Sequence, residues 1–202
     1  MAVYVITDER DDPGSLLRAC EAAIRGGADV IQLRRKHDSG RALIELGRRI
    51  RDLTSSYHAL YIVNDRVDVA IATDADGVHI GQDDMPLSDA HRLLGQKIIG
   101  VSAATVEDAR QAIIDGADYL GIGAIFATPS KAGADIAGLR EISDVVHGCP
   151  LVAIGGIGEA NANMVLSAGA DGLAVVSAVM SARNPEEATR RLRNRVAGLR
   201  RR

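Results

Sequence analysis

A short apolar run followed by a helix-like segment recurs eight times along this chain of 202 residues. Each run ends in a glycine, a hydroxyl, an amide or a charged residue. The runs cover residues 3–7, 29–34, 60–64, 76–81, 98–102, 119–123, 151–155 and 172–177. Strands that alternate with helices form a parallel sheet, and eight such strands close a (β/α)8 TIM barrel. We therefore predict an α/β fold with one barrel domain over residues 1–202, whose active site lies at the carboxyl ends of the strands.

The composition agrees with a buried parallel sheet and narrows the classes of function. Hydrophobic residues make up 47% of the chain and aromatic residues only 2%, so Val, Ile, Leu and Ala must fill the core. The net charge of −3 gives no reason to expect a nucleic acid partner. No apolar run is long enough to cross a membrane, and the first residues do not resemble a secretory signal. We predict a soluble cytoplasmic protein; its oligomeric state, a homo-oligomer included, stays open.

One segment departs from this even charge distribution. Arginines gather near the carboxyl end, at positions 190, 191, 193, 195, 200, 201 and 202. We interpret them as part of a helix surface rather than a nucleic-acid arm. Cations are favoured near the carboxyl end of a helix, and few aromatic side chains are available to stack on bases.

The tripeptide Gly-Ala-Asp precedes three of the predicted strands, at residues 27–29, 116–118 and 169–171. These are junctions from helix to strand, which lie on the face of the barrel opposite the active site. We predict that they stabilise the fold and take no part in function. The longest irregular stretch, residues 127–137, follows the sixth strand and suits a loop that closes over a ligand.

An anion site is predicted at the end of the second strand. Side chains two apart on a strand share a face, so Gln32, Arg34 and Lys36 point the same way. Two cations and an amide at a barrel mouth suit phosphate oxygens. Arg35, between them, is interpreted as a solvated loop residue.

Acidic residues follow the third and fourth strands, beside this anion site. Asn64 and Asp65 end the third strand, and Asp83 and Asp84 follow the fourth. Mg²⁺ usually takes one or two carboxylates together with substrate phosphate oxygens and water. The two strand ends together therefore predict a magnesium–diphosphate site.

Further polar residues follow the later strands. Ser102 ends the fifth strand, and Thr128, Ser130 and Lys131 lie in the long loop after the sixth. Lys131 could place positive charge where a leaving group develops negative charge. Since no Ser-His-Asp, Cys-His or paired-Glu arrangement can be assembled from the strand ends, this inventory favours electrostatic catalysis of diphosphate departure. His79, on the fourth strand, is expected in the core.

A second phosphate site is predicted at the last two strands. Gly156 follows the seventh strand, and Val176 and Ser177 follow the eighth. These two loops commonly bind phosphate on this barrel through backbone N–H groups and a helix N-terminus. Two phosphate sites imply two phosphorylated reactants.

With these residues identified, the chain resembles the thiamine-phosphate synthase family along nearly its whole length. The matching segments are residues 4–8, 32–36, 64–68, 76–84, 100–102, 117–123, 128–131, 152–157 and 169–177. The family joins 4-amino-2-methyl-5-hydroxymethylpyrimidine diphosphate to 4-methyl-5-(2-phosphoethyl)thiazole, giving thiamine phosphate and diphosphate. In the family the diphosphate leaves first, and the thiazole nitrogen captures the pyrimidine carbocation, so no general base is needed.

The resemblance implies a role for each matching residue. Mg²⁺ would be bound by Asp65 and Asp84. Thr128 and Ser130 would lie over the diphosphate or the thiazole phosphate, and the thiazole phosphate would contact Gly156, Val176 and Ser177. The residues expected to hold the pyrimidine diphosphate are Gln32, Arg34, Lys36, Asn64, Ser102 and Lys131, of which Arg34, Ser102 and Lys131 are expected to be catalytic.

Two positions depart from the family pattern, and two other functions compete. Ser130 stands where the family has Thr, and Ala104, two residues after Ser102, stands where members often have His. The thiazole tautomerase shares this barrel, but its relatives use a His at the place of Ala104 and tend to lose the Asn-Asp pair. A phosphate-ligand sensor without catalysis would have no use for a metal site. Turnover separates the three: the synthase needs both substrates and Mg²⁺, the tautomerase needs one substrate and no metal, and a sensor only binds.

Overall fold

The structure, a computed structural model, describes residues 2–126 and 135–199. Its strands form a closed parallel barrel in which each strand pairs with the next and the last pairs with the first. They are β1 (Val3–Ile6), β2 (Val30–Leu33), β3 (Leu60–Asn64), β4 (Gly77–Ile80), β5 (Ile98–Ala103), β6 (Tyr119–Ile122), β7 (Leu151–Ile154) and β8 (Gly172–Val175). The TIM barrel predicted from the sequence is confirmed.

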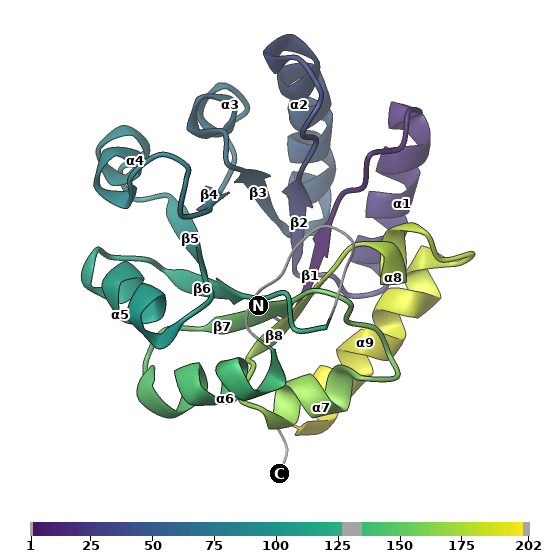
Figure 1. Cartoon of the computed structure of the whole chain (residues 1–202). Helices are drawn as coiled ribbons and strands as arrows, with labels where there is room; N and C mark the ends of the chain where they lie inside the picture. The colour runs from purple at the N-terminus through teal and green to yellow at the C-terminus, as the bar shows by residue number, and fades with distance from the viewer. Residues whose placement is uncertain (1, 127–134, 200–202) are drawn as a thin grey trace.

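Helices surround the barrel as a ring (Figure 1). They are α1 (Pro13–Arg25), α2 (Gly40–Tyr57), α3 (Val67–Ala72), α4 (Leu87–Leu94), α5 (Val106–Ile114), α6 (Ile136–Val145), α7 (Ala162–Ser167), α8 (Ser177–Met180) and α9 (Pro185–Leu199). The short helix α8 lies at the carboxyl end of β8, and α9 then packs against both α7 and α1, which closes the ring. Among the described residues, we find no helix with the length and apolar character needed to cross a membrane.

The alternation of side chains along each strand divides the apolar residues into two layers. On β1, Val3 and Val5 face outward into the layer between strands and helices, whereas Tyr4 and Ile6 face the barrel interior. The other buried members of the interior cluster are Val30, Ile62, Tyr119, Val152 and Ala174. The interior is therefore a packed core whose upper end forms the floor of the strand-end face.

Four aspartates seal the bottom of the barrel in the same way. Each stands just before an even-numbered strand and accepts a hydrogen bond from a backbone N–H of the preceding strand. The pairs are Asp29 with Val3 at 3.0 Å, Asp76 with Tyr61 at 2.7 Å, Asp118 with Ile99 at 2.7 Å and Asp171 with Leu151 at 2.8 Å. Three of them belong to the Gly-Ala-Asp junctions, whose predicted structural role is supported by these bonds. The fourth was not recognised in the sequence, because Asp74 takes the place of glycine there, with a left-handed φ of 47°.

Asp118→Ala is expected to lower the free energy of unfolding by about 1–2 kcal/mol, because the buried N–H of Ile99 loses its acceptor. The activity per folded molecule should not change, since the bond lies at the far end of the barrel. Urea unfolding measures the loss. Asp115→Ala, which removes an exposed carboxylate that accepts from the side chain of Gln111, is the matched control and should change stability by less than about 0.5 kcal/mol. Equal losses in the two variants would contradict the sealing role.

The arginines of α9 pair with acidic residues on the protein surface. Arg190 contacts both Glu186 and Glu187 on the same helix, while Arg193 contacts Asp29 and Arg195 contacts Glu159. Most of these pairs are exposed and contribute little stability individually. They neutralise much of the basic stretch, which supports its interpretation as a helix surface for the described arginines.

Candidate active site

The end of β2 carries the predicted anion site. Gln32 points into the barrel with 2% of its surface exposed, and its Nε2 donates to the hydroxyl of Tyr4 at 2.9 Å. The backbone of Arg34 is held by Thr7, whose Oγ1 accepts from the Arg34 N–H at 2.9 Å and donates to the Arg34 carbonyl at 3.1 Å. Arg34 is half-buried and Lys36 is exposed. Of the three residues only Gln32 lies in the strand itself, because β2 ends at Leu33, and Arg34 and Lys36 follow in the loop.

Arg35 does not behave as the sequence led us to expect. Its side chain is only 12% exposed and forms an ion pair with Asp38 at 3.0 Å. It also donates to the backbone carbonyls of Asp8 and Arg10 in the loop after β1. The interpretation of Arg35 as a solvated loop residue is therefore wrong: it ties together the loops that follow the first two strands.

The end of β3 turns sharply at Asp65. The backbone of Asp65 has a left-handed φ of 61°, which Asp tolerates better than most residues, and its N–H donates to the carbonyl of His79 on β4 at 2.8 Å. This bond continues the pairing of β3 with β4 by one residue beyond Asn64. It fixes the half-buried carboxylate of Asp65 at the strand end.

Asp65 and Asp84 form a close pair of carboxyl groups. Burial raises the pKa of Asp65 to about 6, and a hydrogen bond to Asp84 and the negative charge of Asp84 act in the same direction. Lys36 and Arg34 oppose this rise, which places both cations within electrostatic reach of the pair. Asp84 is itself held by the N–H of Gly81, which donates to its Oδ2 at 2.7 Å. Two adjacent carboxyls that hold a proton at mildly acidic pH make a site with affinity for a cation.

The donor set fits magnesium better than a metal held wholly by the protein. Among residues 2–126 and 135–199, no group of three or more His, Cys, Asp or Glu side chains lies close enough together to hold a metal ion. A pair of carboxylates facing cationic side chains suits Mg²⁺, which completes its octahedron with water and substrate phosphate oxygens.

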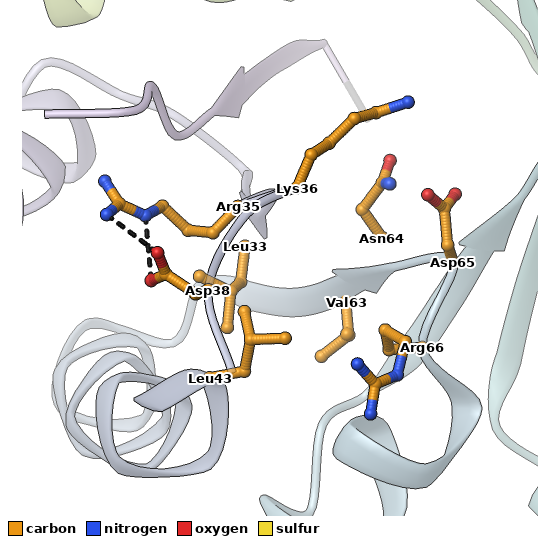
Figure 2. Close-up of a pocket in the computed structure, with 9 residues that line it drawn as sticks. All are labelled: Leu33, Arg35, Lys36, Asp38, Leu43, Val63, Asn64, Asp65 and Arg66. Carbon is orange, nitrogen blue, oxygen red and sulfur yellow. Dashed lines mark hydrogen bonds and ion pairs between the residues drawn. The ribbon is translucent and has the colours of Figure 1, made fainter. Parts of the chain in front are cut away.

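A cavity of about 170 Å³ lies between the loops that follow β2 and β3. In Figure 2, the polar ends of Lys36, Asn64 and Asp65 point to the same side of it, while Arg35 and Asp38 pair on another side. Its lining residues are Leu33, Arg35, Lys36, Asp38, Leu43, Val63, Asn64, Asp65 and Arg66. The structure therefore brings Lys36, Asn64 and Asp65 together, as predicted.

Ser102, at the end of β5, contacts a residue that we expected to be part of the core. Its hydroxyl lies 3.0 Å from Nε2 of His79, while its carbonyl accepts from Nε2 of Gln82 at 2.6 Å. The imidazole of His79 packs on the ring of Tyr119, with centroids 5.5 Å apart. His79 is half-buried and reaches the predicted site through Ser102.

The loops after β7 and β8 lie side by side, because these strands are neighbours in the barrel. Gly156 has a φ of +62°, and a Cβ there would lie 2.9 Å from Cβ of Phe126, so the loop requires glycine. Asn161 braces the loop by accepting from the N–H of Gly158 and donating to the carbonyl of Gly156. Val176 is the N-cap of α8, which Ser177 begins, and no side chain caps that helix end. Both loops thus present exposed backbone at one edge of the mouth.

Three predicted site residues lie outside the described residues. They are Thr128, Ser130 and Lys131, in the stretch between residues 126 and 135. Their roles stay predictions.

Sequence reasoning missed two tyrosines that support the site from below. Tyr4 and Tyr119 are 2% and 1% exposed, and their hydroxyls lie 2.8 Å apart inside the barrel. The available signal was their residue type, because a buried phenol requires a hydrogen-bond partner. That each of these hydroxyls is the partner of the other could be seen only in the three-dimensional structure.

A family model described as thiamine monophosphate synthase matches residues 3–179. The thiamine-phosphate synthase of Chloroflexus aurantiacus is 55% identical over 95% of this chain and 90% of its own length. That of Moorella thermoacetica is 53% identical over 94% of this chain and 92% of its own length.

Solved structures agree with these relatives. The thiamine phosphate pyrophosphorylase of Pyrococcus furiosus superposes with a TM-score of 0.91 at 45% identity, over 98% of this chain and 96% of that one. A 3-hexulose-6-phosphate synthase, at 18% identity and a TM-score of 0.75, shares the fold alone. The match to the family model, together with identities of 45% to 55% over nearly the whole of each chain, shows that this protein belongs to the thiamine-phosphate synthase family.

Proposed function

We propose that the protein joins 4-amino-2-methyl-5-hydroxymethylpyrimidine diphosphate to 4-methyl-5-(2-phosphoethyl)thiazole, giving thiamine phosphate and diphosphate. The observation that carries this proposal is the meeting of opposite charges at the mouth, where the carboxyl pair of Asp65 and Asp84 lies within reach of Lys36 and Arg34. Such an arrangement suits a diphosphate with its metal ion, the cations contacting the oxygens and the carboxylates holding the metal.

The bonds that break and form in this reaction require few functional groups from the protein. The C–O bond between the pyrimidine methylene and the diphosphate breaks, and its electron pair leaves with the oxygen. The lone pair of the thiazole nitrogen then forms the new C–N bond to the methylene carbon. This sequence transfers no proton, so the site needs no general base. It needs donors that stabilise the leaving diphosphate and walls that keep water from the carbocation.

Each group of residues has a part in this scheme. Arg34 and Lys36, with Asn64, would bind the diphosphate, and Ser102 would donate to it. Lys131 would add positive charge as the diphosphate leaves. Asp65 and Asp84 would hold Mg²⁺, which when bound neutralises part of the diphosphate charge.

Remaining polar groups would place the rest of the substrates. Gln32 would contact the pyrimidine side, and Thr128 and Ser130 would cover the phosphates. Gly156, Val176 and Ser177 would bind the thiazole phosphate at the other edge of the mouth. A cytoplasmic location also remains a prediction from the sequence.

Diphosphate release from the purified protein tests the function. The protein is mixed with both substrates, with and without Mg²⁺, and thiamine phosphate is measured together with diphosphate. We expect both products in equal amounts, and only when metal and both substrates are present. Conversion of a thiazole substrate alone, without metal, would identify a tautomerase. Binding of the thiazole phosphate with no turnover would identify a sensor.

Mg²⁺ should raise the melting temperature more at pH 8 than at pH 5. The raised pKa of Asp65, about 6 against 3.8, means that without metal this group favours the fold below about pH 4 and that this contribution is lost as the pH rises through 6. Mg²⁺ binds the ionised pair and competes with the proton. At 100 times its Kd it would add about 2.7 kcal/mol, or roughly 5–10 °C.

Differential scanning fluorimetry with and without Mg²⁺ across this pH range measures the effect. Asp65→Asn should abolish the rise in melting temperature, whereas Asp83→Asn, which removes a neighbouring exposed charge, should retain it. A rise of equal size in both variants would show that Mg²⁺ binds elsewhere.

A further inference from the structure

A continuous chain of hydrogen bonds crosses the barrel interior beneath the mouth. Nε2 of Gln32 lies 2.9 Å from the Tyr4 hydroxyl, which lies 2.8 Å from the hydroxyl of Tyr119. The Tyr119 hydroxyl lies 3.0 Å from Nδ1 of His79, and Nε2 of His79 lies 3.0 Å from Oγ of Ser102. We call these five residues the interior chain. Both of its ends, Gln32 and Ser102, are residues of the proposed substrate site.

The middle of the interior chain is closed to solvent. Tyr4 and Tyr119 are 2% and 1% exposed and lie among apolar side chains of the interior cluster. Burial raises the pKa of both phenols above the ordinary value, so both keep their protons. Each hydroxyl therefore donates one hydrogen bond and can accept another, so the direction of each bond depends on the direction of its neighbours.

Two glycines on β5 and β6 provide the space for the rings. A Cβ at Gly100 would lie 2.0 Å from Cζ of Tyr119, and a Cβ at Gly121 would lie 2.7 Å from Cε1 of His79. The backbone of the barrel is thus built around these two side chains, and their hydroxyl and imidazole groups are held in place.

The direction of the bonds follows from the first donor. The Nε2 group of Gln32 only donates, so the Tyr4 hydroxyl accepts from it; in the arrangement that gives every proton of the chain an acceptor, Tyr4 then donates to the hydroxyl of Tyr119. In the same arrangement the Tyr119 hydroxyl donates a hydrogen bond to Nδ1 of His79. A neutral imidazole that accepts at Nδ1 carries its proton on Nε2, and it donates that proton to Oγ of Ser102.

We propose that the interior chain is polarised from Gln32 to Ser102, so that Tyr4, Tyr119 and His79 act as positioning residues that fix the Ser102 hydroxyl as a hydrogen-bond donor to the substrate. With this polarity Ser102 accepts from His79, which leaves the proton of its hydroxyl for the substrate rather than for the imidazole. Phosphate oxygens only accept hydrogen bonds, so the opposite polarity, which would turn the Ser102 proton toward His79, would not serve them. The assignment of the acceptor as diphosphate rests on the proposed function.

The tautomer of His79 reports the polarity directly. Long-range ¹H–¹⁵N correlation spectra of the intact protein with labelled histidine, near pH 7.5, distinguish a proton on Nε2 from one on Nδ1. The resonances of His79 are assigned by their loss in His79→Asn. We expect the Nε2–H tautomer. The Nδ1–H tautomer or a charged ring would overturn the proposal, whether or not the protein makes thiamine phosphate.

Tyr4→Phe removes one hydroxyl from the middle of the interior chain and leaves the ring. The Tyr119 hydroxyl then no longer accepts a hydrogen bond from Tyr4, so the direction of its own bond to His79 is no longer fixed. We therefore expect a mixture of His79 tautomers. We also expect kcat for diphosphate release to fall on the order of tenfold, the equivalent of one hydrogen bond, with KM for the thiazole phosphate unchanged. An unchanged tautomer in this variant, with or without a fall in kcat, would overturn the proposal.

Tyr61→Phe is the matched control. Tyr61 is also fully buried, but its hydroxyl pairs with Thr73 at 3.3 Å, outside the interior chain. It should change neither the His79 tautomer nor kcat. A wild-type protein with the Nε2–H tautomer but no synthase activity would uphold the polarity and reject the proposed function, so the two failures are distinguishable.

Discussion

Asp65→Asn is expected to lower kcat for diphosphate release by a factor of about 10³ at saturating substrates and Mg²⁺. Asn keeps the shape of the side chain but cannot supply the negative charge that holds the metal beside the diphosphate. The variant should fold normally, and above pH 6 it should be more stable than the metal-free parent, because the ionised pair is gone. Single-turnover measurement of diphosphate separates this loss from slow product release.

Two companion variants make the result specific. Asp84→Asn should lose activity to a similar degree, because both carboxylates would bind the same Mg²⁺ ion. Asp83→Asn, on the same turn but exposed, should stay close to the parent rate. Near-normal rates in both Asp65→Asn and Asp84→Asn would rule out the metal assignment.

The second large effect concerns stability. Gly100→Ala should lower the free energy of unfolding by about 3–5 kcal/mol, because the new methyl group would overlap the ring of Tyr119, 2.0 Å from its Cζ. Any shift of that ring breaks buried hydrogen bonds to Tyr4 and His79 as well. Losses of this size are a large share of the total stability of a typical domain.

Urea unfolding followed by circular dichroism measures this loss. Gly198→Ala is the matched control, because a Cβ there meets no atom within 4 Å and the residue lies in a helix. It should change stability by less than about 1 kcal/mol, and in the favourable direction. A loss below 1 kcal/mol for Gly100→Ala would show that Tyr119 can move freely and would weaken the view of a rigid interior chain.

The barrel could be predicted because buried parallel strands have a simple sequence pattern. Apolar runs that alternate with amphipathic segments define the strand count, and the count defines closure. The prediction of an anion site rested on spacing alone, since alternate residues of a strand such as Gln32, Arg34 and Lys36 are expected to share a face. Their location needed no knowledge of distant residues.

What could not be predicted depends on partners far apart in the sequence. The hydroxyls of Tyr4 and Tyr119 meet across 115 positions, and only the closed register of the sheet brings them together. Arg35 was misread because its acceptors include backbone carbonyls of another loop, which have no sequence signal. The fourth bottom junction was missed because Asp74 adopts there the conformation in which glycine was expected.

The carboxylates at the base of the barrel have a consequence for how the chain can be divided. Each one bonds the strand that it precedes to the strand before it, as Asp76 does for β3 and β4 and Asp118 for β5 and β6. The ring is therefore made of four two-stranded units, each locked by its own side chain, and the seams between units carry no such lock. New chain termini opened in the short connection between α2 and β3, or between α4 and β5, would leave every lock intact. Termini opened within residues 26–29 would place a free chain end beside the lock at Asp29, so the seams are the natural points at which to permute or split this enzyme.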